Sequence, residues 1–312
     1  MKRALFVIAT LLVCFSSAVA DNSWSEGADI NGEGLVDYKD SEIMAKYWLA
    51  TDPNTTECNV PDITWVYIED PGIGGYKGFT GYMSKYETTN AQFAQYLNSA
   101  KASGAVTVNA NYVIGSSGPY SFQNYYRLDG SGVTYNGATN GGAARINYSE
   151  GIFTVDSGFE NHPVTFVSWY GATAFASYYG WRLPTEWEWQ GVADYDGSYT
   201  HATGSALYDS EKFLANYQAN GDNNFAPNDL PYHPWVVYGT SEVGYFGKFG
   251  YGLADMAGNV WEWTSSLWDP QYSYRLLRGG SWKAIDPYCR VSMRWGNYPD
   301  FVDSSIGFRV CR

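Results

Sequence analysis

Signals for helices are confined to two blocks in the main part of this 312-residue chain, and this scarcity restricts the fold most strongly. In KYETTNAQFAQYL, Thr89 and Gln92 form a capping box that predicts a helix start. In VSWYGATAFASYYGWRLPTEWEWQGVA, Ser168 caps one helix, Gly180 ends it, and Thr185 begins another. The remaining sequence is rich in Gly and Tyr and has frequent turn signals, which predicts loops and short strands.

Three further segments carry strand or loop patterns. Residues 102–143 have no helical period and predict a surface loop or weak strands. RINYSEGIFTV predicts a β-hairpin with SEG as its turn. CRVSMRW alternates, so we expect a strand in which Cys289, Val291 and Met293 share one face.

The first twenty residues are typical of a cleaved signal peptide. Lys2 and Arg3 precede an apolar stretch at 4–13, and AVA at 18–20 is a small-residue cleavage site. The apolar stretch is too short to span a membrane, and no later segment comes near a spanning length. We therefore expect a secreted or periplasmic protein whose mature chain starts at Asp21.

The chain is acidic. Loss of Lys2 and Arg3 with the signal peptide changes the formal net charge from -13 to -15. Such a protein is not drawn to nucleic acid or to anionic lipid. Abundant carboxylates suit calcium, which prefers hard oxygen ligands.

Residues 29–40 have the spacing of a calcium-binding loop. Oxygen-bearing side chains occupy loop positions 1, 3, 5, 9 and 12, Gly34 stands at position 6, and the Leu35 carbonyl would supply position 7. The loop and the following apolar helix resemble one repeat of a type I dockerin, which implies calcium and a cohesin-like partner, although dockerins normally have two repeats. An acidic turn before a helix is the alternative. The predicted side-chain ligands are Asp29, Asn31, Glu33, Asp37 and Asp40.

We divide the chain into a signal peptide at 1–20, the dockerin-like repeat at 21–50, a polar linker at 51–63 and one large domain at 64–312. In the large domain RLPTEWEW, GNVWEW, RGGSW and GFRV follow one another in this order. These motifs resemble the formylglycine-generating enzyme family, also called the sulfatase-modifying factor family. The resemblance implies an α+β, C-type-lectin-like fold with two or three helices, short antiparallel strands and bound calcium.

The resemblance implies two calcium sites in this domain. The loop GNVWEW would supply one set of ligands, and the segment LANYQANGDNN would supply the other. The alternative is that Glu262 pairs with a buried arginine and that Asn216 caps a turn. The predicted ligands are the Gly258 and Val260 carbonyls with Glu262, and Asn216 with the Tyr217 carbonyl and Asp222.

The family's oxidases use two cysteines, separated by four residues, to hold copper(I) and oxidise a cysteine of a sulfatase. Cys289 matches the second cysteine and is the catalytic candidate, whereas the first position holds Ala284, which has no thiolate to offer copper. We prefer Cys289 as a buried core residue. Three cysteines remain after signal cleavage, so Cys58 with Cys311 is the preferred bridge, and Cys289 with Cys311 stays open.

Three classes of function remain open. The first is a formylglycine-generating oxidase, and the second is a non-catalytic, calcium-stabilised module that binds a peptide or glycan, with Tyr-rich loops at 120–126 as one wall. The third is an iron oxygenase using His162, His201 and His233. Ala284 favours the second class. Four arginines, 278, 290, 294 and 309, are interpreted as internal ion pairs with Glu186, Glu188 and Asp255.

Overall fold

The computed structural model describes residues 60–72, 78–130, 143–194, 197–198, 200–204, 206–209, 212–218, 239–269, 271 and 273–312. The predicted signal peptide, the dockerin-like repeat and most of the linker lie outside these residues, as do Cys58, Asp222 and His233. None of the helices in the described ranges is long and apolar enough to cross a membrane.

All three predicted helices of the main domain are confirmed. They are α3 (Asn90–Ala102), α4 (Trp169–Tyr178) and α5 (Glu186–Ala193). Each starts where a hydroxyl accepts a hydrogen bond from a backbone N–H of the first turn, which satisfies one of the helix's free donors. The capping residues are Thr89, Ser168 and Thr185, and two of them complete a capping box, with Gln92 and Glu188.

The strands are short, and those in the described ranges form five separate sheets, in agreement with the predicted α+β, C-type-lectin-like fold. Three sheets are antiparallel pairs: β1 (Trp65–Glu69) with β2 (Thr80–Ser84), β6 (Ile146–Ser149) with β7 (Ile152–Val155), and β8 (Tyr208–Asp209) with β9 (Lys212–Phe213). One is the meander β3 (Val106–Asn109), β4 (Tyr112–Gly115) and β5 (Asn124–Arg127). The largest has the order β12 (Trp295–Asn297), β11 (Tyr274–Arg278), β10 (Trp261–Asp269) and β13 (Ile306–Gly307).

The predicted hairpin is confirmed as β6 and β7, with Glu150 and Gly151 at its turn. Both residues have positive φ, 54° and 88°, which is the backbone twist that two-residue hairpin turns require. The segment 102–143 supplies β3, β4 and β5, so its weak strands are real.

The predicted strand in CRVSMRW is wrong. Asp286–Cys289 forms a 3-10 turn, and the strand β12 begins only at Trp295. Proline in the first turn favours the helical φ, and Met293 N donates to Arg290 O, which closes a second turn. The predicted alternation of burial holds only from Cys289 to Ser292, because Met293 and Arg294 are both partly buried and Met293 packs against the other core cluster from Cys289.

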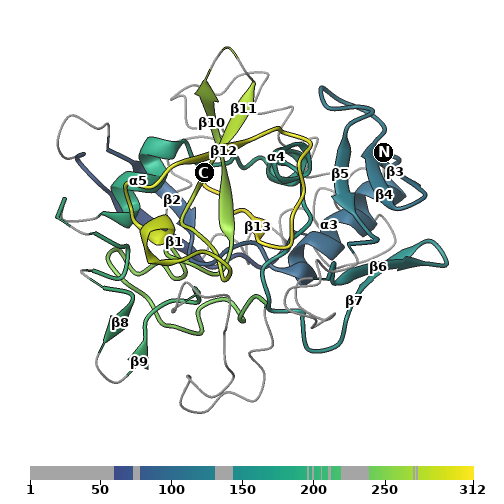
Figure 1. Cartoon of the computed structure of the whole chain (residues 1–312). Coiled ribbons are helices and arrows are strands. Elements are labelled where there is room, and N and C mark those ends of the chain that lie inside the picture. The colour runs from purple at the N-terminus through teal and green to yellow at the C-terminus, as the bar shows by residue number, and fades with distance from the viewer. Residues whose placement is uncertain are drawn as a thin grey trace, which may run out of the picture.

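Two apolar clusters form the core. One joins α3 and α4 through Phe93 and Phe175 and includes Phe308 near the C-terminus. The other surrounds Trp189 of α5 and includes Cys289 and Cys311. Figure 1 shows α5 and α4 on opposite sides of the β10–β11 pair. The β10–β11 pair therefore lies between α4, which packs in the first cluster, and α5, which packs in the second.

Candidate functional site

The sulfur of Cys289 lies in the packed interior. The side chain is 1% exposed, and burial raises the pKa of its thiol to about 12. Nucleophilic attack and soft-metal binding both need the thiolate, which is scarce at neutral pH when the pKa is this high. The structure therefore confirms the interpretation of Cys289 as a buried core cysteine.

The backbone of the RGGS motif wraps around this sulfur. Gly280 has φ +79°, and a Cβ at this position would stand 2.5 Å from the Cys289 sulfur. Backbone N–H groups of Ser281 and Gly258 hydrogen-bond to the sulfur and oppose the rise of its pKa. Gly280 is thus required by the close approach of Cys289.

Neither Ala284 nor Cys311 completes a pair of thiolates with Cys289. Ala284 is buried in the same cluster and binds its neighbours only through its backbone, with its carbonyl accepting from Gln218 N at 2.9 Å. Cys311 is a free, fully buried cysteine, and burial raises the pKa of its thiol to about 12. The bridge between Cys289 and Cys311 that the sequence left open is not formed, since both are free.

The structure brings the two predicted calcium segments into contact. Asn216 O accepts a hydrogen bond from Asn259 N at 2.7 Å. Gly258 has φ +79°, and a Cβ there would stand 2.3 Å from the same Asn216 oxygen. Asn216 therefore supports the GNVWEW loop directly, and the two predicted sites are neighbours.

Asn259 is a fully buried hub that the sequence analysis did not identify. Its side chain donates to Glu87 Oε2 at 2.6 Å and accepts from Ser241 N at 2.9 Å. Val260 N donates to the other Glu87 oxygen at 3.2 Å. The available sequence signal was the Gly-Asn pair, because Asn tolerates the positive φ of 59° that this turn adopts.

Glu262 forms a buried ion pair with Arg309. Arg309 Nε and NH2 donate to the two carboxylate oxygens at 2.7 Å each, and both side chains are 0% exposed. Trp189 Nε1 donates to Oε2 at 2.8 Å. The alternative in which Glu262 pairs with a buried arginine is therefore confirmed.

Two further carboxyl groups face the same guanidinium. Burial raises the pKa of Asp255 to about 6, with Glu262 adding to the rise, while Gly244 N and Arg309 oppose it. Burial, followed by the charges of Asp255 and Glu262, also raises the pKa of Glu87 well above its usual range. One guanidinium thus faces three acids but balances only one negative charge, so Asp255 and Glu87 keep their protons to higher pH than ordinary carboxyl groups do.

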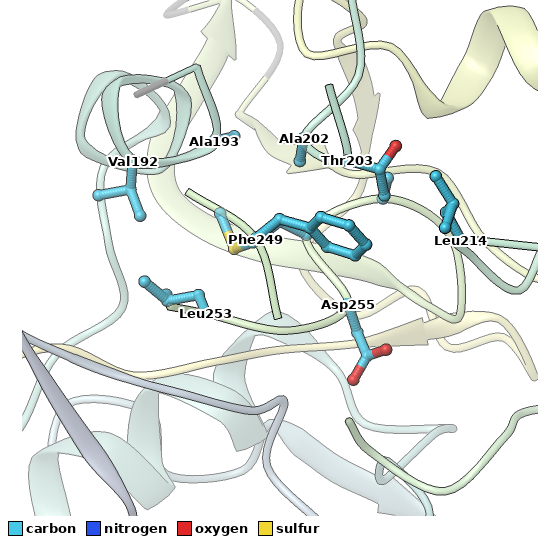
Figure 2. Close-up of a pocket in the computed structure, with 10 residues that line it drawn as sticks. Val192, Ala193, Ala202, Thr203, Leu214, Phe249, Leu253 and Asp255 are labelled. Carbon is cyan, nitrogen blue, oxygen red and sulfur yellow. The ribbon is translucent and has the colours of Figure 1, made fainter. Parts of the chain in front are cut away.

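Asp255 also lines a small pocket, which Figure 2 shows with the ring of Phe249 at its centre. The other lining residues are almost all apolar, and Thr203 is the additional polar one. Since few polar groups converge on it, the pocket does not have the character of a catalytic site.

The arginine prediction is correct in part. Arg294 binds Glu186 through two hydrogen bonds of 2.7 and 2.9 Å. Glu188 pairs instead with Arg182, and Arg290 NH2 lies 3.6 Å from Asp286 Oδ1.

The other two arginines of the prediction have different partners. Arg278 donates to Gln190 and to Val291 O. The partner of Arg309 is Glu262, which the prediction did not include.

The described residues fit the predicted metals poorly. Both Glu262 oxygens already accept hydrogen bonds, so a calcium ion there would have to displace Arg309. In the described ranges no group of three or more His, Cys, Asp or Glu side chains could hold a metal ion. His162 instead contacts Thr240 Oγ1 at 3.0 Å, and buried His201 lies 3.4 Å from Asp286.

A family model described as "Sulfatase-modifying factor enzyme 1-like domain" matches residues 77–312. The chain is 33% identical over 186 residues to "Serine/threonine-protein kinase pkn1" of Chlamydia caviae, covering 54% of this chain and 27% of the kinase. It is 34% identical to "Formylglycine-generating enzyme" of Streptomyces coelicolor, covering 51% of this chain and 55% of that enzyme. It is 35% identical to "Inactive C-alpha-formylglycine-generating enzyme 2" of Mus musculus, covering 47% of this chain and 48% of that protein.

The chain thus matches about a quarter of the kinase and about half of the other two relatives. Among solved structures, "Crystal Structure of CarF" is similar, with a TM-score of 0.51 and 19% identity over 81% of this chain and 98% of that chain. At this level of identity the likeness supports the fold alone.

Replacing Arg309 by methionine is expected to lower the free energy of unfolding by about 3–5 kcal/mol, because it leaves the Glu262 carboxylate buried without its cation. Arg127→Met is the matched control, since Arg127 and Asp129 form a partly exposed pair whose loss costs under about 1 kcal/mol. Urea denaturation measures both values. Equal losses in the two variants would contradict the assigned importance of the buried pair.

The pKa of Asp255 predicts a pH effect on stability. The folded-state pKa of about 6 exceeds the ordinary 3.8, so the folded protein binds the proton more tightly between these values. The free energy of unfolding should therefore fall as pH rises from about 4 to above 6, by up to about 3 kcal/mol. Asp255→Asn should flatten this fall, whereas Asp300→Asn, at an exposed position, should not. Denaturation curves across this range that are identical for wild type and Asp255→Asn would refute the assignment.

Proposed function

Because the chain belongs to the sulfatase-modifying factor family, we propose that it keeps the family fold, lacks copper-dependent oxidation of cysteine, and acts as a binding module. The observation that carries this proposal is the environment of Cys289. Its sulfur is buried, burial raises the pKa of its thiol to about 12, and Ala284 stands where a second cysteine would be needed.

The donor set does not fit copper. Copper(I) prefers soft sulfur ligands, and two thiolates are what the family's oxidases present to it. Here one sulfur is enclosed by the backbone of Gly280 and Ser281, and the other candidate position carries only a methyl group. A similar protein whose name marks it as inactive supports the idea that this fold persists without the oxidation.

Exposed aromatic side chains support a binding role. In the described ranges, six of the eleven large apolar side chains with more than a third of their surface exposed lie on β10, on β12 or near the ends of these strands. Such concentrations of exposed apolar surface mark sites of interaction. The members of this group are Leu267, Trp268, Tyr288, Trp295, Tyr298 and Phe301.

Secretion through a cleaved signal peptide, calcium binding by the 29–40 loop and docking of residues 21–50 to a cohesin-like partner belong to the same proposal. They rest on the sequence alone. A peptide or a glycan is the ligand class that the aromatic surface suits.

If the protein lacks copper-dependent oxidation, a copper(I) titration should show no tight binding. The reduced chain from Asp21 onward should compete poorly for copper(I) against a chelator, and it should form no aldehyde on a peptide containing Cys-x-Pro-x-Arg. Cys289→Ala should leave both results unchanged. The formylglycine-generating enzyme of Streptomyces coelicolor is the positive control, and Ala284→Cys tests whether restoring a second sulfur restores copper binding. Tight copper(I) binding together with aldehyde formation in the unaltered protein would overturn the proposal.

Calcium binding by the 29–40 loop can be tested separately through its effect on thermal stability. Removal of calcium by a chelator should lower the melting temperature, and Asp29→Ala should abolish the binding event seen by calorimetry, because Asp29 occupies position 1 of the loop. Glu262→Gln should reduce stability equally with and without calcium, since its oxygens bind Arg309. A melting temperature that chelation does not change would refute calcium binding by the 29–40 loop.

A further inference from the structure

Arg275 of β11 is a half-buried arginine without a carboxylate partner. Its NH1 donates to Ser265 O at 2.9 Å, and no Asp or Glu of the described ranges pairs with it. Burial lowers the pKa of its guanidinium, which is the expected effect when no anion compensates the lost hydration. Arg182, Arg294 and Arg309, in contrast, each bind a glutamate.

One aromatic ring covers this cation, and two more rings pack against that ring. The guanidinium carbon lies 3.8 Å from the centroid of the Trp169 ring, which is a close cation–π contact. The rings of Tyr120 and Tyr170 pack against the same indole, with centroid-to-centroid distances of 5.5 and 5.6 Å. The centroids of the two tyrosine rings lie 5.5 Å apart. The indole is fixed, because Trp169 Nε1 donates to Thr264 O at 2.8 Å. The cation is therefore held in a rigid aromatic setting.

The polar atoms of this group are available to a ligand. Tyr120 and Tyr170 are both partly exposed. Burial raises the pKa of Tyr170, so its hydroxyl stays protonated and can donate. Asn297 of the edge strand β12 lies opposite Arg275 in the β11–β12 register, and its side-chain oxygen accepts from Tyr298 N at 2.9 Å. Arg275 is partly exposed, and its hydrogen bond to Ser265 O uses NH1, which leaves the edge formed by Nε and NH2 for a ligand.

We propose that Arg275, Tyr120 and Tyr170 bind the anionic group of an acidic saccharide, either a uronate carboxylate or a sulfate ester. A guanidinium presents paired N–H donors that match two oxygens of a planar carboxylate or of a tetrahedral sulfate. The proposal rests on the binding-module function and names its ligand. The site is independent of Cys289, because Trp169 and Cys289 belong to different core clusters.

The charge and the donor pattern select this class of ligand. One guanidinium balances a single negative charge, and the exposed Asp300 is close enough to raise the pKa of Tyr170, so a dianionic phosphate is disfavoured. Phenol hydroxyls and an amide both donate and accept hydrogen bonds, which suits the adjacent hydroxyl groups of a sugar ring. Flat aromatic faces provide the apolar surface that the ring's C–H groups need.

Calorimetric titration of the full chain tests the site with glucuronic acid, glucose 6-sulfate and glucose. Both acidic sugars should bind, and glucose should bind at least about tenfold more weakly, which is the scale of one charge-assisted hydrogen bond. Arg275→Gln should weaken the acidic sugars by about tenfold, and Tyr170→Phe should weaken them by a smaller factor. Arg290→Gln is the matched control, because Arg290 is exposed and pairs with Asp286 elsewhere. Its affinities should be unchanged.

The site is overturned if glucose binds as tightly as the acidic sugars, or if Arg275→Gln loses no affinity. It is also overturned if N-acetylglutamate methylamide binds and the sugars do not, which would assign the site to acidic peptides. If Arg275→Gln does not fold, the Tyr120→Phe/Tyr170→Phe double variant decides, since it removes only two hydroxyls. Absence of all binding refutes this site and leaves the copper result as an independent test of the proposed loss of oxidation.

Discussion

The buried pair of Arg309 and Glu262 is the interaction on which the rest of the domain depends. Arg309 donates to both Glu262 oxygens, to Ala254 O at 2.8 Å and to Ser84 O at 3.2 Å. One guanidinium thereby joins the end of β2, the loop before GNVWEW and strand β10 to the C-terminal GFRV segment. Because such a pair is costly to desolvate, it is maintained only when its hydrogen bonds are satisfied, and here they are.

This arrangement explains why the motifs of the chain serve structure. Glu262 neutralises Arg309, Asn259 binds Glu87 at 2.6 Å, and Gly258 lets Asn216 approach the same loop. Gly280 in turn lets the backbone close over Cys289. The residues that resemble those of an oxidase therefore form a supporting framework, while Arg275 packs against Trp169, which belongs to the other core cluster.

Local signals allowed part of this to be predicted. The capping boxes at Thr89 and Thr185 lie within four residues of sequence, so the helices they begin could be recognised directly. The prediction of a strand at CRVSMRW was wrong, because alternating burial also occurs in consecutive turns. Glu87 and Asn259 are 172 residues apart, and such long-range partners leave no local pattern. Arg275 was missed for the same reason, since its distinguishing feature is a missing partner in space.

The absence of copper chemistry depends on Cys289 being a protonated, enclosed thiol. Its rate of alkylation by iodoacetamide in the native protein, followed by peptide mapping across neutral to alkaline pH, measures this property. We expect Cys289 to stay unmodified at neutral pH under native conditions and to react once denaturant unfolds the chain, because burial raises the pKa of its thiol to about 12. Rapid alkylation of the native protein with an apparent pKa near or below the ordinary thiol value would show instead that the sulfur is accessible and reactive.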